Sequence, residues 1–597
     1  MERVKLIPNQ ELRTEKFHLS KPFIFISVLL LIIICNTQHA QAQWLEYDKI
    51  VASNRMSSDQ FGFDIKTNNN LVVVGAPNRD FPGATDAGAV YVYEKTDIGY
   101  AQLQILSAND LNMSDNFGYS VSISETGEYI IVGAPKQDTD ENGQNPLTDS
   151  GAAYIFKRNP FTGMWAQFQK IVAKDESGNS KRQNGARFGW DVDLTDSPYV
   201  RRAIVGAVHE SEYITVSTSL PKVGAAYIFD GDGGGKWTAS QRLTASDRKA
   251  NDNFGFSVAL ARFKAVVGAI GNDYDGNGQN YIAGSGSAYV FEVGVSARRI
   301  NDYYQTDKLT STDRGVGELF GFEVDIYGNI PQAIFRIVVG APYDNEGQFG
   351  QPVIQNAGSA FIFFSNQYGG NNNWFMDQKL VANDRSAADH YGTSVAIAET
   401  YAMVGATDND KDANGMNILN DSGAGYIYKA GNSPYPSGWI FDEKIVASDR
   451  ESTDHFGYSV ALDVVGNHCV VGAKDEDHDD ATIPGNYLDG AGSAYIFELD
   501  IPAPLRSDGS KKTSTTLSQF AVTPNPSNGQ FEINISNFDP SETYLLTIRD
   551  ISGKKIMEEV ILNFKHSVNL ETQANGVYII TLNDGKQLSH TKIIKSN

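Results

Sequence analysis

The sequence predicts an all-β protein, a seven-bladed β-propeller followed by a small C-terminal β-sandwich domain. The 56 glycines and 20 prolines among 597 residues imply many turns between short strands. A unit of four strand-like elements recurs seven times between Trp44 and Asp500. After Asp500 the repeat stops and a different pattern of alternating strands follows. The aromatic content of 11% and charged content of 20% are typical of a folded chain.

Each unit is defined by short segments that return in a fixed order. A KIVAS-type strand precedes a Phe-Gly or Tyr-Gly pair, and a Val-Gly-Ala segment and an aromatic strand such as GAAYIF follow the pair. The pairs begin at Phe61, Phe117, Phe188, Phe254, Phe320, Tyr391 and Phe456. The Val-Gly-Ala segments begin at Val74, Val132, Val205, Val267, Val339, Val404 and Val471. The aromatic strands begin at Gly88, Gly151, Gly224, Gly286, Gly358, Gly423 and Gly492.

Four strands per unit, repeated seven times, favour a radial propeller whose blades pack face to face. The recurring glycines allow close backbone approach, and the Phe and Tyr side chains fill the wedge between blades. We therefore interpret these residues as structural. The KIVAS-type segment at Trp44–Ser53 precedes the first pair, and none follows the aromatic strand at Ala494–Glu498. The N-terminal strand is thus predicted to complete the seventh blade and leave no open sheet edge.

The alternation of FG, VGAP and GxAYxF resembles the FG-GAP repeat family over about residues 44–499. That family includes the integrin α-subunit head propeller and bacterial surface proteins. The resemblance implies a propeller domain over residues 43–500 and a role in binding or adhesion.

The N-terminal residues 1–42 are predicted to be a secretory signal peptide. Basic residues precede an apolar run at Phe23–Cys35 that is short for a membrane span, and Ala40-Gln41-Ala42 fits a cleavage site. An uncleaved anchor is the alternative. Removal of the segment leaves Cys469 alone, so the mature protein is expected to have no internal disulfide and no transmembrane span.

The formal charge of −23 argues against a nucleic-acid partner, because a polyanion would be repelled at long range. It suits cations, or neutral ligands that are held by hydrogen bonds.

Two loops between a Val-Gly-Ala segment and the following aromatic strand share an acidic pattern. Both fit D-x-D-x-N-G-x5-D, the EF-hand spacing with Asp in place of the terminal Glu. Alternate oxygen ligands can wrap a hard cation, and Gly allows the sharp turn between them, so we predict Ca²⁺ here. The first loop supplies Asp138, Asp140, Asn142, Asp149 and the carbonyl of Gln144, and the second supplies Asp410, Asp412, Asn414, Asp421 and the carbonyl of Met416.

Two further acidic loops are weaker candidates for calcium. One contains Asp273, Asp275 and Asn277, but Gly284 replaces its last carboxylate, and the seventh blade has a cluster that includes Asp475, Asp477 and Asp479. The alternative is that Asp, Asn and Gly simply form polar turns. Integrin α propellers carry calcium between the FG and GAP strands, where this chain has short turns, so integrin ligands do not transfer.

Other recurring residues are interpreted as structural. An acid precedes most FG pairs and is expected to cap a turn; it is found at Asp59, Asp115, Asp252, Asp389 and Asp454. Each tryptophan before a KIVAS-type strand is expected to pack within the repeat. The propeller's histidines form no evident catalytic group in the sequence.

The segment after the propeller is predicted to be a linker, residues 501–518, and a small β-sandwich, residues 519–597. Its motifs TPNPSNG at Thr523, RDISGKKI at Arg549, GVYIITL at Gly576 and the terminal TKIIKSN resemble the type A sorting domain of the type IX secretion system. The resemblance implies that the secretion machinery is a partner and that the chain crosses the outer membrane. An ordinary accessory sandwich is the alternative.

We expect a secreted or bacterial cell-surface protein that binds an extracellular protein or glycan through its acidic loop face, assisted by calcium. The alternatives are an extracellular polysaccharide-degrading enzyme and a structural surface-layer component. No H-E-x-x-H or G-x-S-x-G motif is present, and we expect no enzymatic activity.

Overall fold

The computed structural model describes most of residues 43–500 and 520–595. Within these ranges it leaves out residues 69, 97–98, 198–199, 214, 216–218, 233, 235, 296–299, 330–333, 349–350, 367–373, 432–437, 464–465, 479–486, 524–528, 536–543, 551–554, 562, 571, 575 and 584–587. The predicted signal peptide and linker lie outside the described residues. The chain divides into two compact units, Met1–Pro502 and Ala503–Asn597.

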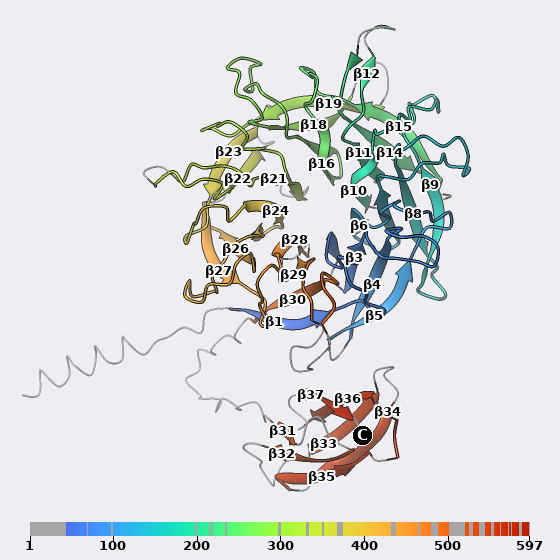
Figure 1. Cartoon of the computed structure of the whole chain (residues 1–597), viewed down its shortest axis with the longest axis vertical. Coiled ribbons are helices and arrows are strands. Elements are labelled where there is room, and N and C mark those ends of the chain that lie inside the picture. The colour runs from blue at the N-terminus through green and yellow to red at the C-terminus, as the bar shows by residue number, and fades with distance from the viewer. Residues whose placement is uncertain are drawn as a thin grey trace, which may run out of the picture. The chain divides into compact units, whose positions relative to one another are not determined.

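The described part of the first unit contains seven four-stranded antiparallel sheets, arranged as blades around a central axis (Figure 1). From the axis outward, the first blade contains β2 (Ile65–Asn68), β3 (Leu71–Ala76), β4 (Ala89–Thr96) and β5 (Gly99–Leu106), and the second contains β6 (Val121–Ile123), β7 (Tyr129–Ala134), β8 (Ala152–Arg158) and β9 (Trp165–Ile171). The third blade contains β10 (Phe188–Ser197), β11 (Val200–Ala207), β14 (Ala225–Gly231) and β15 (Trp237–Leu243). The fourth contains β16 (Phe254–Ala261), β17 (Lys264–Ala269), β18 (Ser287–Val295) and β19 (Ile300–Leu309). The fifth blade contains β20 (Val324–Asn329), β21 (Ile334–Ala341), β22 (Ser359–Asn366) and β23 (Trp374–Leu380). The sixth contains β24 (Tyr391–Ile397), β25 (Tyr401–Ala406), β26 (Ala424–Ala430) and β27 (Trp439–Ile445). The seventh contains β28 (Phe456–Leu462), β29 (His468–Ala473), β30 (Ser493–Asp500) and, as its outer strand, β1 (Gln43–Ile50). A two-stranded hairpin, β12 (Glu212–Tyr213) and β13 (Ser219–Leu220), projects from the third blade.

The N-terminal strand closes the ring, as the sequence predicted. Strand β1 pairs antiparallel with β30, from Gln43 opposite Asp500 to Ile50 opposite Ala494. The last blade therefore contains both ends of the repeat region, and its outer strand is held by ladder hydrogen bonds rather than by the chain connection alone.

Neighbouring blades meet through glycine. A Cβ placed on the Val-Gly-Ala glycine of any blade would lie 2.0–2.2 Å from the carbonyl oxygen of the FG glycine in the next blade. The pairs are Gly75 with Gly118, Gly133 with Gly189, Gly206 with Gly255, Gly268 with Gly321, Gly340 with Gly392, Gly405 with Gly457 and Gly472 with Gly62. Since no real Cβ tolerates such a distance, these positions exclude every other residue at this spacing.

Aromatic and aliphatic side chains fill the wedges between blades. Phe117, for example, meets Tyr154 and Phe156 edge-on, with ring centroids 5.4 and 5.9 Å apart. The tryptophans that precede the KIVAS-type strands are buried, which confirms their structural interpretation; they are Trp44, Trp165, Trp237, Trp374 and Trp439. Each blade pair thus shares its own hydrophobic cluster.

The second unit is a small β-sandwich. One sheet contains β31 (Phe520–Thr523), β32 (Gln530–Ile535) and β35 (Lys565–Asn569); the other contains β34 (Lys555–Ile561), β33 (Tyr544–Asp550), β36 (Gly576–Asn583) and β37 (Leu588–Lys595). Both sheets contribute to one core, in which Ile533 and Val568 join Leu546 and Ile580. The part of the chain that the structure describes contains no helix long and apolar enough to cross a membrane.

Candidate binding face

Two sets of loops lie on the same face of the propeller, which we call the loop face. One set joins the second and third strands of each blade, and the other joins the outer strand of a blade to the next FG pair. The residue before each FG pair donates its backbone N–H to the first set of loops, at 3.0–3.2 Å. The donor and acceptor pairs are Gln60 with Gly490, Asn116 with Asp86, Arg187 with Asp149, Asn253 with Lys222, Leu319 with Gly284, His390 with Asn356 and His455 with Asp421.

These contacts require left-handed backbone on both sides. Asp149 and Asp421, predicted as terminal calcium ligands, have φ of 49° and 52°, and Gly284 at the matching place has φ of 60°. Asp and Asn tolerate this conformation better than most residues, and Gly best of all. The structure therefore gives the last position of the predicted motif a role that does not require a metal.

The first acid of each predicted loop acts as a clasp across the loop. The Oδ1 of Asp138 accepts the N–H of Asp149 at 2.8 Å, and the same bond forms in the other blades that contain the motif. The matching acceptors are Asp273 for Gly284, Asp410 for Asp421 and Asp477 for Gly490, at 2.7–2.9 Å. The clasp explains why an acid recurs here.

The second acid of each loop organises a tight turn. Oδ1 of Asp140 accepts the N–H groups of Asn142 and Gln144, both at 2.9 Å, while Oδ2 accepts the amide of Asn145 at 2.7 Å. The carbonyl of Gln144 accepts the N–H of Asp140. The other two loops repeat this pattern, with Asp275 accepting from Asn277 and Asp412 accepting from Asn414 and Met416.

An arginine braces each of these loops from the side. Arg182 donates to the carbonyls of Asp138 and Asn145, and Arg314 and Arg450 bind the corresponding carbonyls of the other two loops. These guanidinium groups compensate part of the loops' negative charge. Within the described residues, the acids of the predicted loops are not gathered into a group of three with ligand atoms within 4.8 Å.

The seventh-blade acids lie in a different setting. Asp475 and Asp477 line an open cavity of about 320 Å³ together with His455, Tyr487 and Asp489. Asp479 lies outside the described residues. Asp475 is already engaged, because it pairs with His455 at 2.8 Å and with Lys474.

A chain of alternating histidines and aspartates crosses from the sixth blade to the seventh, and the sequence did not reveal it. His390 Nδ1 lies 2.5 Å from Asp408, whose other oxygen lies 3.5 Å from His455 Nε2. His455 Nδ1 then pairs with Asp475. Burial opposes the charge on His455, but the hydrogen bond of Asp475 and the charges of Asp475 and Asp408 raise its pKa above the usual value. His390 directly precedes the Tyr391-Gly392 pair and His455 directly precedes the Phe456-Gly457 pair. This shared position in the repeat is the sequence feature that could have indicated their proximity.

The acids before the FG pairs are turn caps, as the sequence predicted. Each accepts the backbone N–H three residues earlier, at 2.6–2.8 Å; the acceptors are Asp59, Asp115, Asp252, Asp389 and Asp454. Burial raises the pKa of Asp115 and Asp454 to about 7 and that of the other three to about 6.

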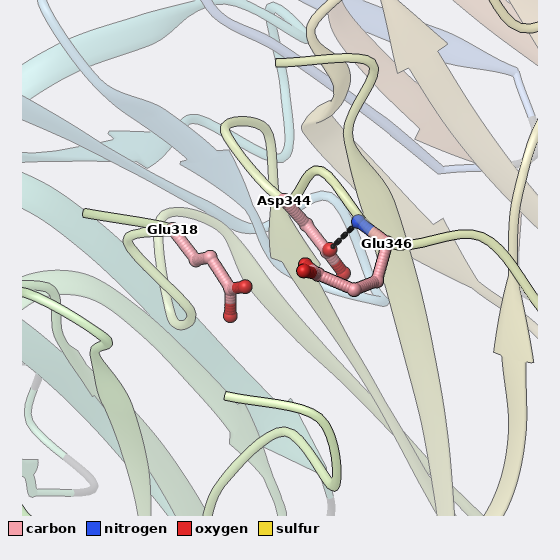
Figure 2. A group of neighbouring side chains, drawn as sticks. All are labelled: Glu318, Asp344 and Glu346. Atoms are coloured by element: carbon pink, nitrogen blue, oxygen red, sulfur yellow. Dashed lines mark hydrogen bonds between the residues drawn. The ribbon is translucent and has the colours of Figure 1, made fainter. Parts of the chain in front are cut away.

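The fifth blade replaces this cap by Glu318 and brings it together with Asp344 and Glu346 (Figure 2). It is the one such group of three acidic, histidine or cysteine side chains in the described residues. Burial and the charge of Asp344 raise the pKa of Glu318 to about 8. The sequence did not reveal this group, because its members come from two separate loops.

The central channel opens on the loop face through a ring of aromatic side chains. The residues that follow the FG pairs line a cavity of about 180 Å³ there; they are Phe63, Tyr119, Trp190, Phe256, Phe322, Thr393 and Tyr458. Neighbouring rings lie 4.8–5.7 Å apart. Asp64, Asp191 and Glu323 follow immediately in the sequence and line the same cavity. Burial raises the pKa of Asp64 to about 6, and burial with the charge of Asp64 raises that of Asp191 to about 7.

Exposed apolar side chains are distributed around the loop face. Its loops carry Met56, Met113, Tyr213, Tyr281, Val316, Val353, Met416, Ile418 and Tyr487, whereas the described loops of the opposite face carry Phe161, Met164 and Phe263. Methionine and aromatic residues are enriched at protein interfaces. Among the described loops, exposed apolar side chains are therefore more frequent on the loop face.

These sheets and loops define a repeat β-propeller with one elaborated face. The FG-GAP repeat family matches at residues 44–93, 100–156, 237–291, 303–363, 374–428 and 439–497, together more than half of the chain. The chain belongs to the FG-GAP repeat family. The three inner strands of the third blade, β10, β11 and β14, lie outside the matched segments, although this blade keeps its Phe188-Gly189 pair.

Residues 521–596 match the secretion system C-terminal sorting domain. That domain marks proteins that the type IX secretion system exports to the cell surface or the extracellular space. The chain is therefore a secreted or cell-surface protein whose C-terminal unit interacts with the type IX secretion machinery.

Comparison with whole proteins gives only distant similarity. No curated protein matches the chain. Among solved structures, it is similar to the crystal structure of RRP9 WD40 repeats, with 10% identity and a TM-score of 0.42 over 77% of this chain and 100% of that one. It is also similar to Saccharomyces cerevisiae Sqt1, with 8% identity and a TM-score of 0.39 over 76% of this chain and 100% of that one.

The raised pKa values of the cap aspartates predict how the free energy of unfolding depends on pH. Their folded pKa lies above the ordinary value of 3.8, so the folded state binds more protons than the unfolded state between that value and about 7. The destabilisation of the fold by these buried, ionised carboxylates is greatest above pH 7 and decreases as the pH falls. Asp115→Asn should therefore raise the melting temperature by a few degrees at pH 8 and by less at pH 5, measured by calorimetry in chelator. An equal gain at both values would contradict the assignment.

Proposed function

We propose that the chain is a surface binding or adhesion protein that recognises an extracellular protein or glycan through the loop face. The observation that carries the proposal is the presence of exposed apolar side chains on the described loops of every blade on that face, among acidic loops. Methionine and aromatic side chains among polar ones are typical of protein interfaces.

The aromatic mouth of the channel gives the face a concave point of contact. Its rings line a cavity together with Asp64 and Asp191, and the side chains of Arg187 and Lys474 lie over the rings of Trp190 and Tyr458. Because rings and carboxylates attract positive charge, this mouth favours a cationic group beside these two, for instance a lysine or arginine side chain of a protein ligand. The formal charge of −23 would also speed the approach of a basic partner.

A blocking experiment tests the use of this face. Val353 is 68% exposed on a loop-face loop, and Phe161 is 96% exposed between β8 and β9 on the opposite face. Cys469 is buried, so a cysteine introduced at either position is the reactive thiol of residues 43–597. Val353→Cys and Phe161→Cys would each be coupled to a bulky maleimide polymer and applied to arrays of glycans and extracellular matrix proteins.

Saturable binding should be lost when the polymer is attached at residue 353 and kept when it is attached at residue 161. Loss at 161 alone, or equal loss at both, would contradict the loop face as the binding surface. Absence of any saturable binding would favour a structural surface-layer component, and turnover of an arrayed polysaccharide would favour an enzyme.

We further propose that calcium assists binding by occupying the loops at Asp138–Asp149 and Asp410–Asp421. The spacing of their oxygens supports this, and the tips at Gly143 and Gly415 are open, because a Cβ added at either glycine would meet no atom within 4 Å. A bound ion in each loop would stiffen the loop face at the second blade and at the sixth blade.

Calorimetric titration of the chelated chain with Ca²⁺ tests these loops. Saturable sites should be lost on Asp140→Ala and Asp412→Ala, which remove a carboxylate from each loop. Asp175→Ala is a matched control, since Asp175 forms the same kind of turn with Ser177 and Asn179 outside the motif. Unchanged calcium binding in the double variant would reduce the loops to polar turns.

A further inference from the structure

The fifth blade contains a group of carboxylates that its own side chains leave uncompensated. Glu318 lies in the loop before β20, and Asp344 and Glu346 lie in the loop between β21 and β22. One oxygen from each lies within 4.8 Å of the other two. Figure 2 shows the three side chains converging from the two loops.

Glu318 is fully buried and aimed into this group. Its exposed fraction is 0%, and neither carboxylate oxygen accepts a hydrogen bond of ordinary geometry. Asp344 is also 0% exposed, and one buried oxygen of Glu346 has no hydrogen-bond partner. Buried polar atoms without hydrogen-bond partners are costly, so a group of this kind calls for a ligand.

The nearby cations compensate this group only in part. Lys379 Nζ lies 2.7 Å from Asp344 but also 2.6 Å from Asp313. Its single positive charge is therefore shared by two carboxylates and leaves Glu318 and Glu346 without a cation of their own among the described residues. Arg385 donates to the backbone carbonyls of Asn345 and Pro352. Neither group donates a hydrogen bond to Glu318.

Three other blades show a compensated arrangement at this position. Their cap acid meets a neutral or basic side chain: Asp59 meets Arg79 at 3.2 Å, Asp115 meets the amide of Gln137 at 2.8 Å and Asp252 meets the amide of Asn272 at 3.3 Å. The fifth blade has Asp344 in the place of that partner and the longer Glu318 in the place of the cap.

The seventh blade also combines two acids, yet it compensates them. There Glu476 accepts a hydrogen bond from Ser493 and has Lys49 at 2.9 Å and Arg55 at 3.9 Å. It has no third carboxylate in the described residues that corresponds to Glu346. The uncompensated arrangement therefore belongs to the fifth blade.

We propose that Glu318, Asp344 and Glu346 bind a hard divalent cation, Ca²⁺, at a buried site in the fifth blade. Calcium takes carboxylate oxygens at about 2.3–2.6 Å, so oxygens within 4.8 Å of one another can all contact one ion. The three ligands are carboxylates, and no thiol or imidazole belongs to the group, so the site favours a hard cation over the softer transition-metal ions. The ion would tie two loops of the loop face together, independently of the two EF-hand-like loops and of the ligand.

Counting bound calcium tests the site. The chelated chain, residues 43–597, would be titrated with Ca²⁺ in a calorimeter alongside Glu318→Gln and Glu346→Gln. Each variant should bind one calcium ion fewer per chain than the unsubstituted protein. Asp115→Asn, the matched cap in a blade with an amide partner, should bind the same number as the unsubstituted protein.

Thermal melting separates loss of the site from loss of the fold. In chelator, Glu318→Gln should melt at no lower a temperature than the unsubstituted chain, because it replaces a buried carboxyl whose oxygens have no hydrogen-bond partner, while its melting temperature should gain less from added Ca²⁺. Equal calcium counts in Glu318→Gln and the unsubstituted chain, or no calcium bound by either, would overturn the proposal.

Discussion

Each blade of the propeller touches the next through bare backbone, where a glycine of one Val-Gly-Ala strand lies against the carbonyl of the next FG glycine. The contact occurs at all seven boundaries between the described blades, including the one between Gly472 and Gly62 that closes the ring. Because no side chain fits there, the spacing of the inner strands is set by van der Waals contact of main-chain atoms. The larger side chains then fill the wedge that widens outward.

The geometry of the loop face follows from this contact. With FG pairs held against the preceding blade, the residue before each pair reaches the neighbouring loop and bonds to a left-handed residue there, such as Asp149 or Asp421. The residue after each pair points into the channel, which creates the aromatic mouth. The elements that we propose for recognition are thus placed by a rigid scaffold, although they lie on loops or at strand ends.

The repeat made the fold predictable, whereas the site was only partly so. Strand order, ring closure through Trp44 and the turn caps at Asp59 and its counterparts follow from local patterns that recur, and the structure confirms them. The acid pattern at Asp138 and Asp149 was visible too, but a pattern cannot distinguish a metal ligand from a loop clasp, since both need an oxygen acceptor at the same spacing. The calcium prediction for these loops remains a prediction.

Features made by separate loops or by different blades could not be predicted from spacing along the chain. Glu318 and Asp344 belong to separate loops of one blade, and the pairing of β20 with β21 brings them together. His390 and His455 belong to separate blades, and the six channel aromatics belong to six blades, so their proximity depends on the ring geometry.

Main-chain contact between blades is the constraint that sets the ring, and it can be measured directly. The measurement is the free energy of unfolding in urea for Gly133→Ala and Gly143→Ala. A Cβ on Gly133 would lie 2.2 Å from the Gly189 carbonyl, whereas one on Gly143, at φ 73°, would meet nothing within 4 Å. We expect a loss of about 3 kcal/mol for Gly133→Ala, from overpacking, and about 1 kcal/mol for Gly143→Ala, from backbone strain. Equal losses would show that the contact does not constrain the ring.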